Sequence, residues 1–275
     1  YLDNIRNSQF GPNENYAREL LELHTLGVHG GYTQRDVREV ARCLTGWTIE
    51  RRSLRNYDGL VFEEKHHDDG EKIVLGRRIA PGGGQQDLDQ VLDIVLNHPA
   101  TANHIAGKLG HHFLGTDRGP HVEAAERSFR EHRGQVVPVL QALFVPSALL
   151  DSAPLLKRPF DYTVSALRAV AAETDGGAGV QAHLEAMGQP LFEWPMPDGF
   201  PDRTDSWTGS LLARWNFASA LAADEIPGTT APWSAIRERS GGSIGQAILG
   251  EPFGHGSSPI EEATLALASP AFMWR

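Results

Sequence analysis

The chain has almost no cysteine and no long hydrophobic run. Its 275 residues include a single cysteine, Cys43. One thiol cannot form a disulfide within the chain, and its place in an expected helix over residues 37–44 indicates an inert structural side chain. No apolar run approaches the roughly 20 residues that a membrane helix requires. The sequence therefore argues against a disulfide-built fold, and we expect no membrane span.

Positive charge is also scarce. The chain has 35 acidic and 25 basic residues, which gives a formal net charge of −10. Nucleic acids and anionic membranes both repel an acidic protein, so we expect no nucleic-acid partner. The hydrophobic fraction of 40% and the charged fraction of 22% are ordinary for a folded globular chain. A chain of this length can bury a substantial core without metals or disulfides.

Several common catalytic signatures are missing as well. The sequence has no P-loop, no Gly-x-Gly-x-x-Gly, no His-Glu-x-x-His and no Cys-x-x-Cys spacing. Candidate functional residues must therefore be weighed one by one against ordinary structural roles.

Helical periodicity dominates what the chain does contain. An opening helix is expected over residues 12–26, because Pro12 suits a first turn and Gly27 suits a helix end. A second helix follows residues 33–36, which resemble a capping box with Asp in place of Glu or Gln. Similar spacing predicts helices over these further ranges: 88–96, 102–113, 121–132, 137–144, 162–170 and 211–223. The pattern indicates a mainly α protein.

The expected architecture is one irregular multi-helix domain over residues 1–275 with long loops. Residues 72–79 predict one short strand or hairpin insertion. The core is expected over residues 12–172, and a C-terminal helical subregion over 180–275 contains a loop rich in Pro and Trp. Loops of that length within a compact domain tend to be functional.

The opening helix carries two kinds of charged residue. At about 100° per residue, Glu14, Arg18 and Glu22 lie opposite the apolar face and predict a solvated ion-pair ladder. Glu19 lies at the edge of the apolar face. A carboxylate there is either half-buried with a partner or faces a cleft.

Histidines and acids also cluster in an irregular segment, residues 66–70. His67 and Asp68 could supply a general base or bind a metal, and the alternative is a simple turn. On the expected helix over 102–113, His104 and His111 share a face. They could hold a transition metal, although exposed helix histidines are the commoner case.

The long loop alternates aromatic and acidic side chains. These are Trp194, Asp198, Phe200, Asp202, Asp205 and Trp207. Aromatic faces beside carboxylates suit a sugar-like ligand, and paired carboxylates suit glycoside hydrolysis when their separation is right. The alternative is a proline-stiffened loop whose tryptophans fill the core.

Blocks of sequence along nearly the whole chain resemble one uncharacterised bacterial family, domain of unknown function 1800. The most specific are NENYARELLELHTLG at 13–27, YTQRDV at 32–37, ARCLTGW at 41–47, His67-Asp68 with Gly70 and Lys72, HPATA at 98–102, KRP at 157–159, SALRA at 165–169, GQPLF at 188–192, PDGFP at 197–201 and SPAF at 269–272.

The resemblance implies a helical, exported protein of the periplasm or the extracellular space. Members of the family are often encoded beside a sulfatase-like partner. The chain corresponds to the C-terminal, larger part of the family and starts at Tyr1, so we expect it to be a processed product or a fragment that lacks N-terminal site elements.

The leading hypothesis is a hydrolase that acts on a polar or carbohydrate-containing substrate. Glu19, His67 and Asp68 would form its acid–base or metal-binding cluster, and this requires Glu19 and His67 to meet in an open pocket. The expected substrate-binding residues are Trp47, Lys72, Trp194, Asp198, Asp202 and Trp207. Two alternatives stay open: a non-catalytic binding or assembly partner of a sulfatase-like protein, and an oxidoreductase whose histidines bind a metal or haem.

Overall fold

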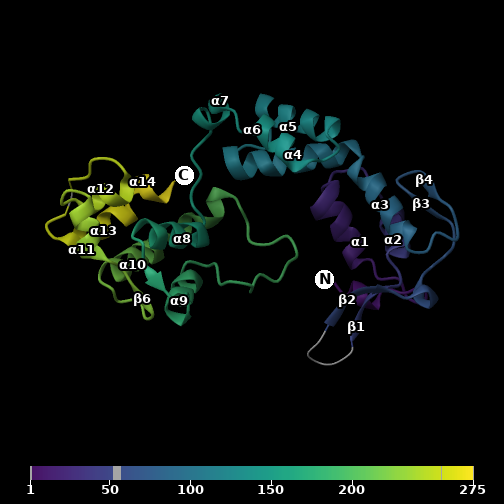
Figure 1. The fold of residues 1–275 in the computed structure, drawn as a ribbon, viewed down its shortest axis with the longest axis horizontal. Coiled ribbons are helices and arrows are strands. Elements are labelled where there is room, and N and C mark those ends of the chain that lie inside the picture. The colour runs from purple at the N-terminus through teal and green to yellow at the C-terminus, as the bar shows by residue number, and fades with distance from the viewer. Residues whose placement is uncertain (1, 52–56, 255, 275) are drawn as a thin grey trace. The chain divides into compact units, whose positions relative to one another are not determined.

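The computed structural model describes residues 2–51, 57–254 and 256–274. Helices dominate it, as Figure 1 shows, so the prediction of a mainly α protein is confirmed. The chain divides into two compact units, Tyr1–Ala153 (unit 1) and Pro154–Arg275 (unit 2). The expectation of one domain stays a prediction.

Unit 1 combines helices with two small antiparallel hairpins. The β3–β4 hairpin confirms the strand prediction over residues 72–79, whereas the β1–β2 hairpin was not predicted. The elements are η1 (Asn4–Arg6), α1 (Asn15–Glu19), η2 (Leu20–Thr25), α2 (Gln34–Cys43), β1 (Trp47–Arg51), β2 (Tyr57–Phe62), η3 (Glu64–His66), β3 (Lys72–Val74), β4 (Arg77–Ile79), α3 (Gln86–Leu96), α4 (Pro99–Leu114), α5 (Pro120–Glu131), α6 (Val136–Leu143) and α7 (Pro146–Leu150).

The opening helix changes type half-way. It begins as the α-helix α1 and continues as the π-helix η2. The Thr25 hydroxyl donates to the Leu20 carbonyl at 2.6 Å, and Leu26 N donates to the Leu21 carbonyl at 2.9 Å. The backbone bond from Leu26 to Leu21 spans five residues, which is the π-helical spacing, and the Thr25 side chain bonds over the same interval. The helix ends before Gly27, whose φ of +82° suits glycine, as the sequence predicts.

The charged ladder of this helix contains the predicted Glu14–Arg18 ion pair, and it also contacts neighbouring elements. Glu14 pairs with Arg18 at 3.3 Å and with Arg38 of α2 at 3.5 Å. Glu22 accepts a hydrogen bond from the Tyr32 hydroxyl at 3.2 Å. A wheel drawn at α-helical spacing misplaces residues beyond Glu19, because the helix becomes π-helical there. The ladder therefore ties the helix to α2 and to the segment before it.

The second helix begins as predicted. Thr33 N donates to Asp36 Oδ2 at 2.8 Å, and Asp36 N donates to the Thr33 hydroxyl at 3.3 Å, which completes the capping box. Asp36 also accepts from Leu75 N in the β3–β4 turn at 2.7 Å. One carboxylate thus caps α2 and fixes the hairpin against it.

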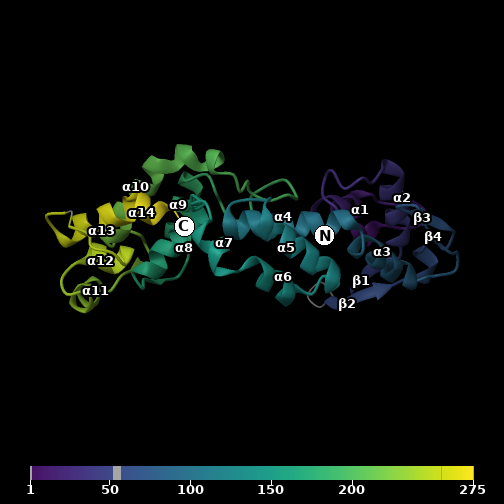
Figure 2. The same cartoon turned by 90° about the horizontal axis from the view of Figure 1, so that it is seen from above.

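Helices α4, α5 and α6 lie side by side in both Figure 1 and Figure 2. They enclose a small apolar cluster of their own, separate from the cluster around α1, α2 and α3. His104 of α4 donates from Nε2 to the Leu23 carbonyl at 3.1 Å. The ring approaches Gly27 so closely that a Cβ there would clash with it. His104 therefore satisfies a carbonyl near the end of the opening helix.

Unit 2 is built on a third apolar cluster, which includes Tyr162, Phe217, Leu221 and Leu267. Helix α10 confirms the predicted helix over 211–223 to within one residue. The elements are α8 (Pro159–Ala169), β5 (Glu173–Thr174), α9 (Ala178–Ala186), η4 (Thr204–Ser210), α10 (Leu211–Ala222), β6 (Thr229–Thr230), α11 (Trp233–Arg239), α12 (Ile244–Leu249), α13 (Pro259–Ala268) and α14 (Pro270–Met273).

Candidate functional site

The most connected polar group in unit 1 surrounds His67. We call it the His67 cluster, and its members are Arg42, Thr45, His67, Asp68, Lys72 and Asp87. It lies where the end of α2, the segment after η3, strand β3 and the first turn of α3 meet. Three of its members, His67, Asp68 and Lys72, are site residues that the sequence predicts.

His67 is buried, and both of its ring nitrogens have polar partners. Its side chain is 1% exposed. Nδ1 donates to the Thr45 carbonyl at 2.9 Å, and Nε2 lies 3.2 Å from Asp87 Oδ2. The ring has no nitrogen left for a substrate or a metal. His67 therefore lies in the interior of unit 1, whereas the hydrolase hypothesis expects it in an open pocket.

Asp87 and Lys72 form a completely buried ion pair. Lys72 Nζ donates to Asp87 Oδ2 at 2.5 Å, and neither side chain is exposed. Lys72 Nζ also donates to the Asp68 carbonyl. Removal of one partner of such a pair strongly destabilises the folded protein, because the other charge is left buried without a counter-charge. Lys72 thus serves the interior of unit 1. Asp87, like Arg42 and Thr45, is a member of the cluster that the sequence prediction missed.

The Asp87 carboxylate is only half satisfied. Its Oδ1 atom has no hydrogen-bond partner among the described residues. Gly83 stands so close to Oδ1 that a Cβ at this position would collide with it. The loop before α3 therefore needs a residue without a side chain here, which explains one glycine of the Gly82-Gly83-Gly84 run.

Asp68 is held by Arg42. The guanidinium contributes two hydrogen bonds, Nε to Oδ2 at 2.7 Å and Nη2 to Oδ1 at 3.1 Å. These bonds lower the pKa of Asp68 and raise that of Arg42. Asp68 N donates to the Thr45 hydroxyl at 2.8 Å. A carboxylate fixed in this way locks the loop to α2 and is a poor general base, because its lowered pKa weakens its affinity for a proton.

Two further predicted residues lie in unit 1. Trp47 begins β1 and packs on Phe62 with a centroid distance of 5.3 Å, and Phe62 packs on His67 at 5.2 Å. Trp47 therefore extends the apolar surroundings of the His67 cluster. Glu19 lies half-buried on α1. The pKa of Tyr32 is raised mainly by burial and by the charge of Glu22, and the charge of Glu19 adds to this. The bonds that define the His67 cluster do not include Glu19.

The other predicted residues belong to a segment of unit 2 that we call the aromatic loop, residues 188–207. Trp194 Nε1 donates to Asp198 Oδ1 at 3.0 Å, and its ring packs on Phe200 at a centroid distance of 4.9 Å. Phe200 in turn lies 6.2 Å from Trp207. The stack runs from an exposed ring, Trp194, to a buried one, Trp207.

The base of this stack is anchored in unit 2. Trp207 is 5% exposed, and its Nε1 donates to the Pro201 carbonyl at 2.9 Å. Asp205 is paired with Arg203 at 2.8 Å, and Asp202 is exposed. Trp207 thus fills the core, as the structural alternative expects, whereas Trp194 stays at the surface. The sugar-ligand interpretation of the loop stays a prediction.

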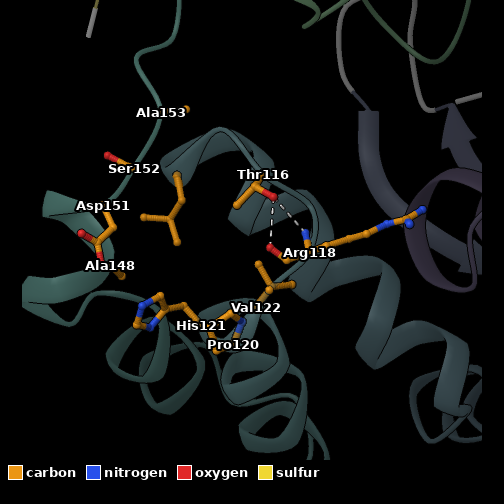
Figure 3. A pocket seen from close by; sticks show the side chains of 11 residues that line it. Thr116, Arg118, Pro120, His121, Val122, Ala148, Asp151, Ser152 and Ala153 are labelled. Carbon is orange, nitrogen blue, oxygen red and sulfur yellow. Dashed lines mark hydrogen bonds between the residues drawn. The ribbon is translucent and has the colours of Figure 1, made fainter.

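A pocket of about 200 Å³ lies in unit 1, and sequence reasoning did not find it. Figure 3 shows it between the end of α4, the start of α5 and the segment after α7. Leu114, Val122 and Ala148 form a mainly apolar wall, and the Arg118 side chain extends away from it. Within the described chain no hydrogen bond joins His121 to Asp151, so the pocket holds no assembled catalytic pair.

The spacing Gly-x-Ser-x-Gly occurs once, at residues 241–245. It is typical of the nucleophile turn of α/β-hydrolases, which joins a strand to a helix. Here the preceding element is the helix α11. Ser243 instead caps α12 by accepting from Gln246 N at 3.2 Å, and its hydroxyl donates to Glu262 at 2.5 Å. The spacing therefore serves as a helix cap.

The described residues contain no group of three or more His, Cys, Asp or Glu side chains that could hold a metal ion. His104 is engaged with the opening helix, and burial lowers its pKa. Cys43 is buried, and this burial raises the pKa of its thiol to about 12. A thiol with such a pKa is a poor nucleophile.

The chain matches a family model described as "Protein of unknown function (DUF1800)" over residues 1–274. It belongs to this family. No curated protein and no solved structure matches the chain. No helix in the part of the chain that the structure describes is long and apolar enough to cross a bilayer.

Proposed function

We propose that this DUF1800 protein acts by binding a partner protein, without catalysing a reaction itself, and that the aromatic loop is its contact surface. The main observation in favour of a binding role over a catalytic one is the complete burial of His67. Its side chain is 1% exposed and both ring nitrogens are engaged. A residue in this state stabilises the fold, which favours the assembly hypothesis over the hydrolase hypothesis.

The aromatic loop supports a protein contact because it exposes large apolar side chains close together in sequence. Phe192 is 99% exposed, Met196 58% and Trp194 39%. Aromatic residues and methionine are enriched at protein interfaces, and a few such residues supply most of the binding energy. Phe192 also has a φ of +63°, an unfavourable value for a bulky residue and one that tends to occur at functional sites.

The stack beneath the loop supports the same proposal. Trp194 is held by Asp198 and by Phe200, which packs on the buried Trp207. A side chain that is fixed before binding loses less conformational entropy on association. The loop thus presents a partly preorganised anchor.

From the family resemblance we further propose that the chain is an exported bacterial protein and that its partner is sulfatase-like. A carbohydrate ligand is the second occupant that Trp194 and Asp198 suit, since a flat ring and a carboxylate can stack on and hydrogen-bond to a sugar. The hydrolase and oxidoreductase hypotheses stay predictions.

The test measures binding of the purified chain to the sulfatase-like protein encoded beside it. The double variant Phe192→Ser, Trp194→Ser should weaken the complex on the order of 10- to 100-fold, as expected for interface anchors. Val137→Ser is the matched control, because Val137 is 64% exposed on α6 of unit 1. It should leave the dissociation constant unchanged.

Three outcomes would count against the proposal. Equal binding by the wild type and the double variant would remove the loop from the interface. Loss of oligosaccharide binding in the double variant, with protein binding intact, would make the ligand a carbohydrate. Turnover of any substrate by the purified chain alone would sink the non-catalytic assignment.

A further inference from the structure

Unit 2 buries an arginine that lacks a counter-charge. Arg214 of α10 is 0% exposed. Its Nε donates to the Ser210 hydroxyl at 3.0 Å. Its two terminal nitrogens, Nη1 and Nη2, have no hydrogen-bond acceptor in the described part of the chain. Up to four N–H donors therefore point into the interior of unit 2 without a partner.

The surroundings do little to compensate this charge. The guanidinium lies over the Tyr162 ring, with Cζ 5.2 Å from the centroid, which gives a favourable but partial interaction. Burial lowers the pKa of Arg214, and Tyr162 is the one titratable neighbour, among the described residues, that opposes this shift. A guanidinium cannot lose its proton in a protein, so the charge remains.

The helix adds to the imbalance. Arg214 is the fourth residue of α10, which begins at Leu211. The N-terminal end of a helix carries a partial positive charge and attracts anions. A buried cation at this end is opposed by the helix dipole, whereas a cation at the C-terminal end would be favoured. Both features attract the same kind of ligand.

We propose that Arg214 anchors a buried binding site for one small oxyanion, of the carboxylate or phosphate class. Because Nε is already bonded to Ser210, the edge that remains is formed by Nη1 and Nη2. Two parallel N–H groups on this edge match two oxygens of a carboxylate or phosphate. Buried waters could accept the hydrogen bonds, but they would not neutralise the charge.

The site lies beneath the end of the aromatic loop. The Ser210 hydroxyl that accepts from Arg214 donates to the Trp207 carbonyl at 2.7 Å. Trp207 is itself tied to Pro201. Because Arg214 is fully buried, we expect a bound anion to exchange slowly. The site does not depend on the proposed function, since it stands on the interior of unit 2 and not on the exposed rings.

The first experiment uses the wild-type chain. Desalted protein is denatured, and the released anions are quantified by ion chromatography. In parallel, thermal unfolding is measured in sodium acetate, sodium phosphate and sodium chloride at one ionic strength. We expect either about one retained oxyanion per chain or a melting temperature that rises to saturation with acetate or phosphate. No retained anion together with equal responses to all three salts would overturn the site.

Three variants locate the effect. Arg214→Met should abolish retention and the saturable rise. Arg214→Lys keeps the charge but loses the paired donors, and should weaken acetate or phosphate binding at least about tenfold. Arg168→Met removes an exposed arginine of α8 in the same unit and should behave as the wild type.

The lysine variant also serves if the methionine variant fails to fold. Undiminished oxyanion binding in Arg214→Lys or Arg214→Met would place the anion elsewhere and overturn the assignment. Loss of binding in Arg168→Met would do the same.

Discussion

Among the described residues, unit 1 and unit 2 each bury one long cationic side chain, and they surround it in opposite ways. Lys72 is 1% exposed and lies against the Asp87 carboxylate, with His67 on the same oxygen. Arg214 is 0% exposed and has a hydroxyl and an aromatic ring, but no carboxylate, among its described neighbours. The first arrangement is internally balanced. The second has no counter-charge among the described residues, and this is why we propose an anion from outside the chain there. A buried ion pair thus marks a structural cluster, whereas an unpaired buried charge marks a candidate ligand site.

The largest effect should come from breaking the balanced side. Asp87→Ala leaves Lys72 buried without a counter-charge and His67 without its second partner. We expect the free energy of unfolding of unit 1 to fall by about 3–5 kcal/mol. Urea denaturation followed by hydrogen exchange in α2 and α3 measures it.

Asp205→Asn is the control for that change, because it removes an exposed carboxylate paired with Arg203. Solvent screens an exposed ion pair strongly, so its removal should change the free energy of unfolding little. Equal losses in both variants would mean that the buried pair is not special.

A smaller loss is expected from crowding the same carboxylate. Gly83→Ala places a Cβ against Asp87 Oδ1. The loop or the carboxylate must shift, and overpacking of this kind costs about 1–3 kcal/mol. Chemical denaturation measures the change. Gly82→Ala is less suitable as a control, because Gly82 has a φ of +81°, whereas Gly11→Ala meets open space and should have almost no effect.

The opposite sign is expected in unit 2. In protein freed of bound anion, Arg214→Met removes an uncompensated buried charge and keeps an apolar side chain of similar length. Its stability should be unchanged or higher, by on the order of 1 kcal/mol, since apolar replacements of buried charges are often neutral or stabilising. Thermal unfolding of dialysed wild type and variant measures this. A loss as large as that of Asp87→Ala would end the contrast between the two units.

The smallest effect concerns pH. The Arg42 hydrogen bonds hold the pKa of Asp68 below its ordinary value of 3.8. A lowered pKa contributes stability that is present above the unfolded value and is lost as the pH falls through the folded one. The stability difference between the wild type and Asp68→Asn should therefore shrink below about pH 4. Urea titrations from neutral to acidic pH measure it, and a difference that grows in acid would contradict the assignment.

Sequence reasoning found the elements whose signals are local. The capping box of Thr33 and Asp36, the β3–β4 hairpin and helix α10 all follow from neighbouring residues, and the structure confirms them. The π-helical half of the opening helix could not be read in this way, because periodicity assumes one helix type. The β1–β2 hairpin lies in a segment without clear alternation, and residues 52–56 lie outside the described part.

The candidate site was found only in part, although one further signal was available. Asp87 stands at i, i+4 and i+8 with Val91 and Val95, both fully buried. The same test applied to α10 places Arg214 on one face with Phe217 and Leu221. A charged residue at an apolar-face position therefore marked both buried ions. The partner of such a charge depends on tertiary contacts, which helix periodicity does not contain.

The π-helix at residues 20–25 also indicates that the opening helix holds one residue more than an α-helix of the same span. A π-helical turn corresponds to an α-helix that holds one additional residue. Deleting a single residue from this stretch would allow an unbroken α-helix. It would also rotate the preceding part of the helix relative to Gly27, against which the His104 ring packs. The ion pair from Glu14 to Arg38 of α2 would then lose its register. We therefore expect insertions and deletions in this stretch to be tolerated poorly during the divergence of the family, even where substitutions are accepted.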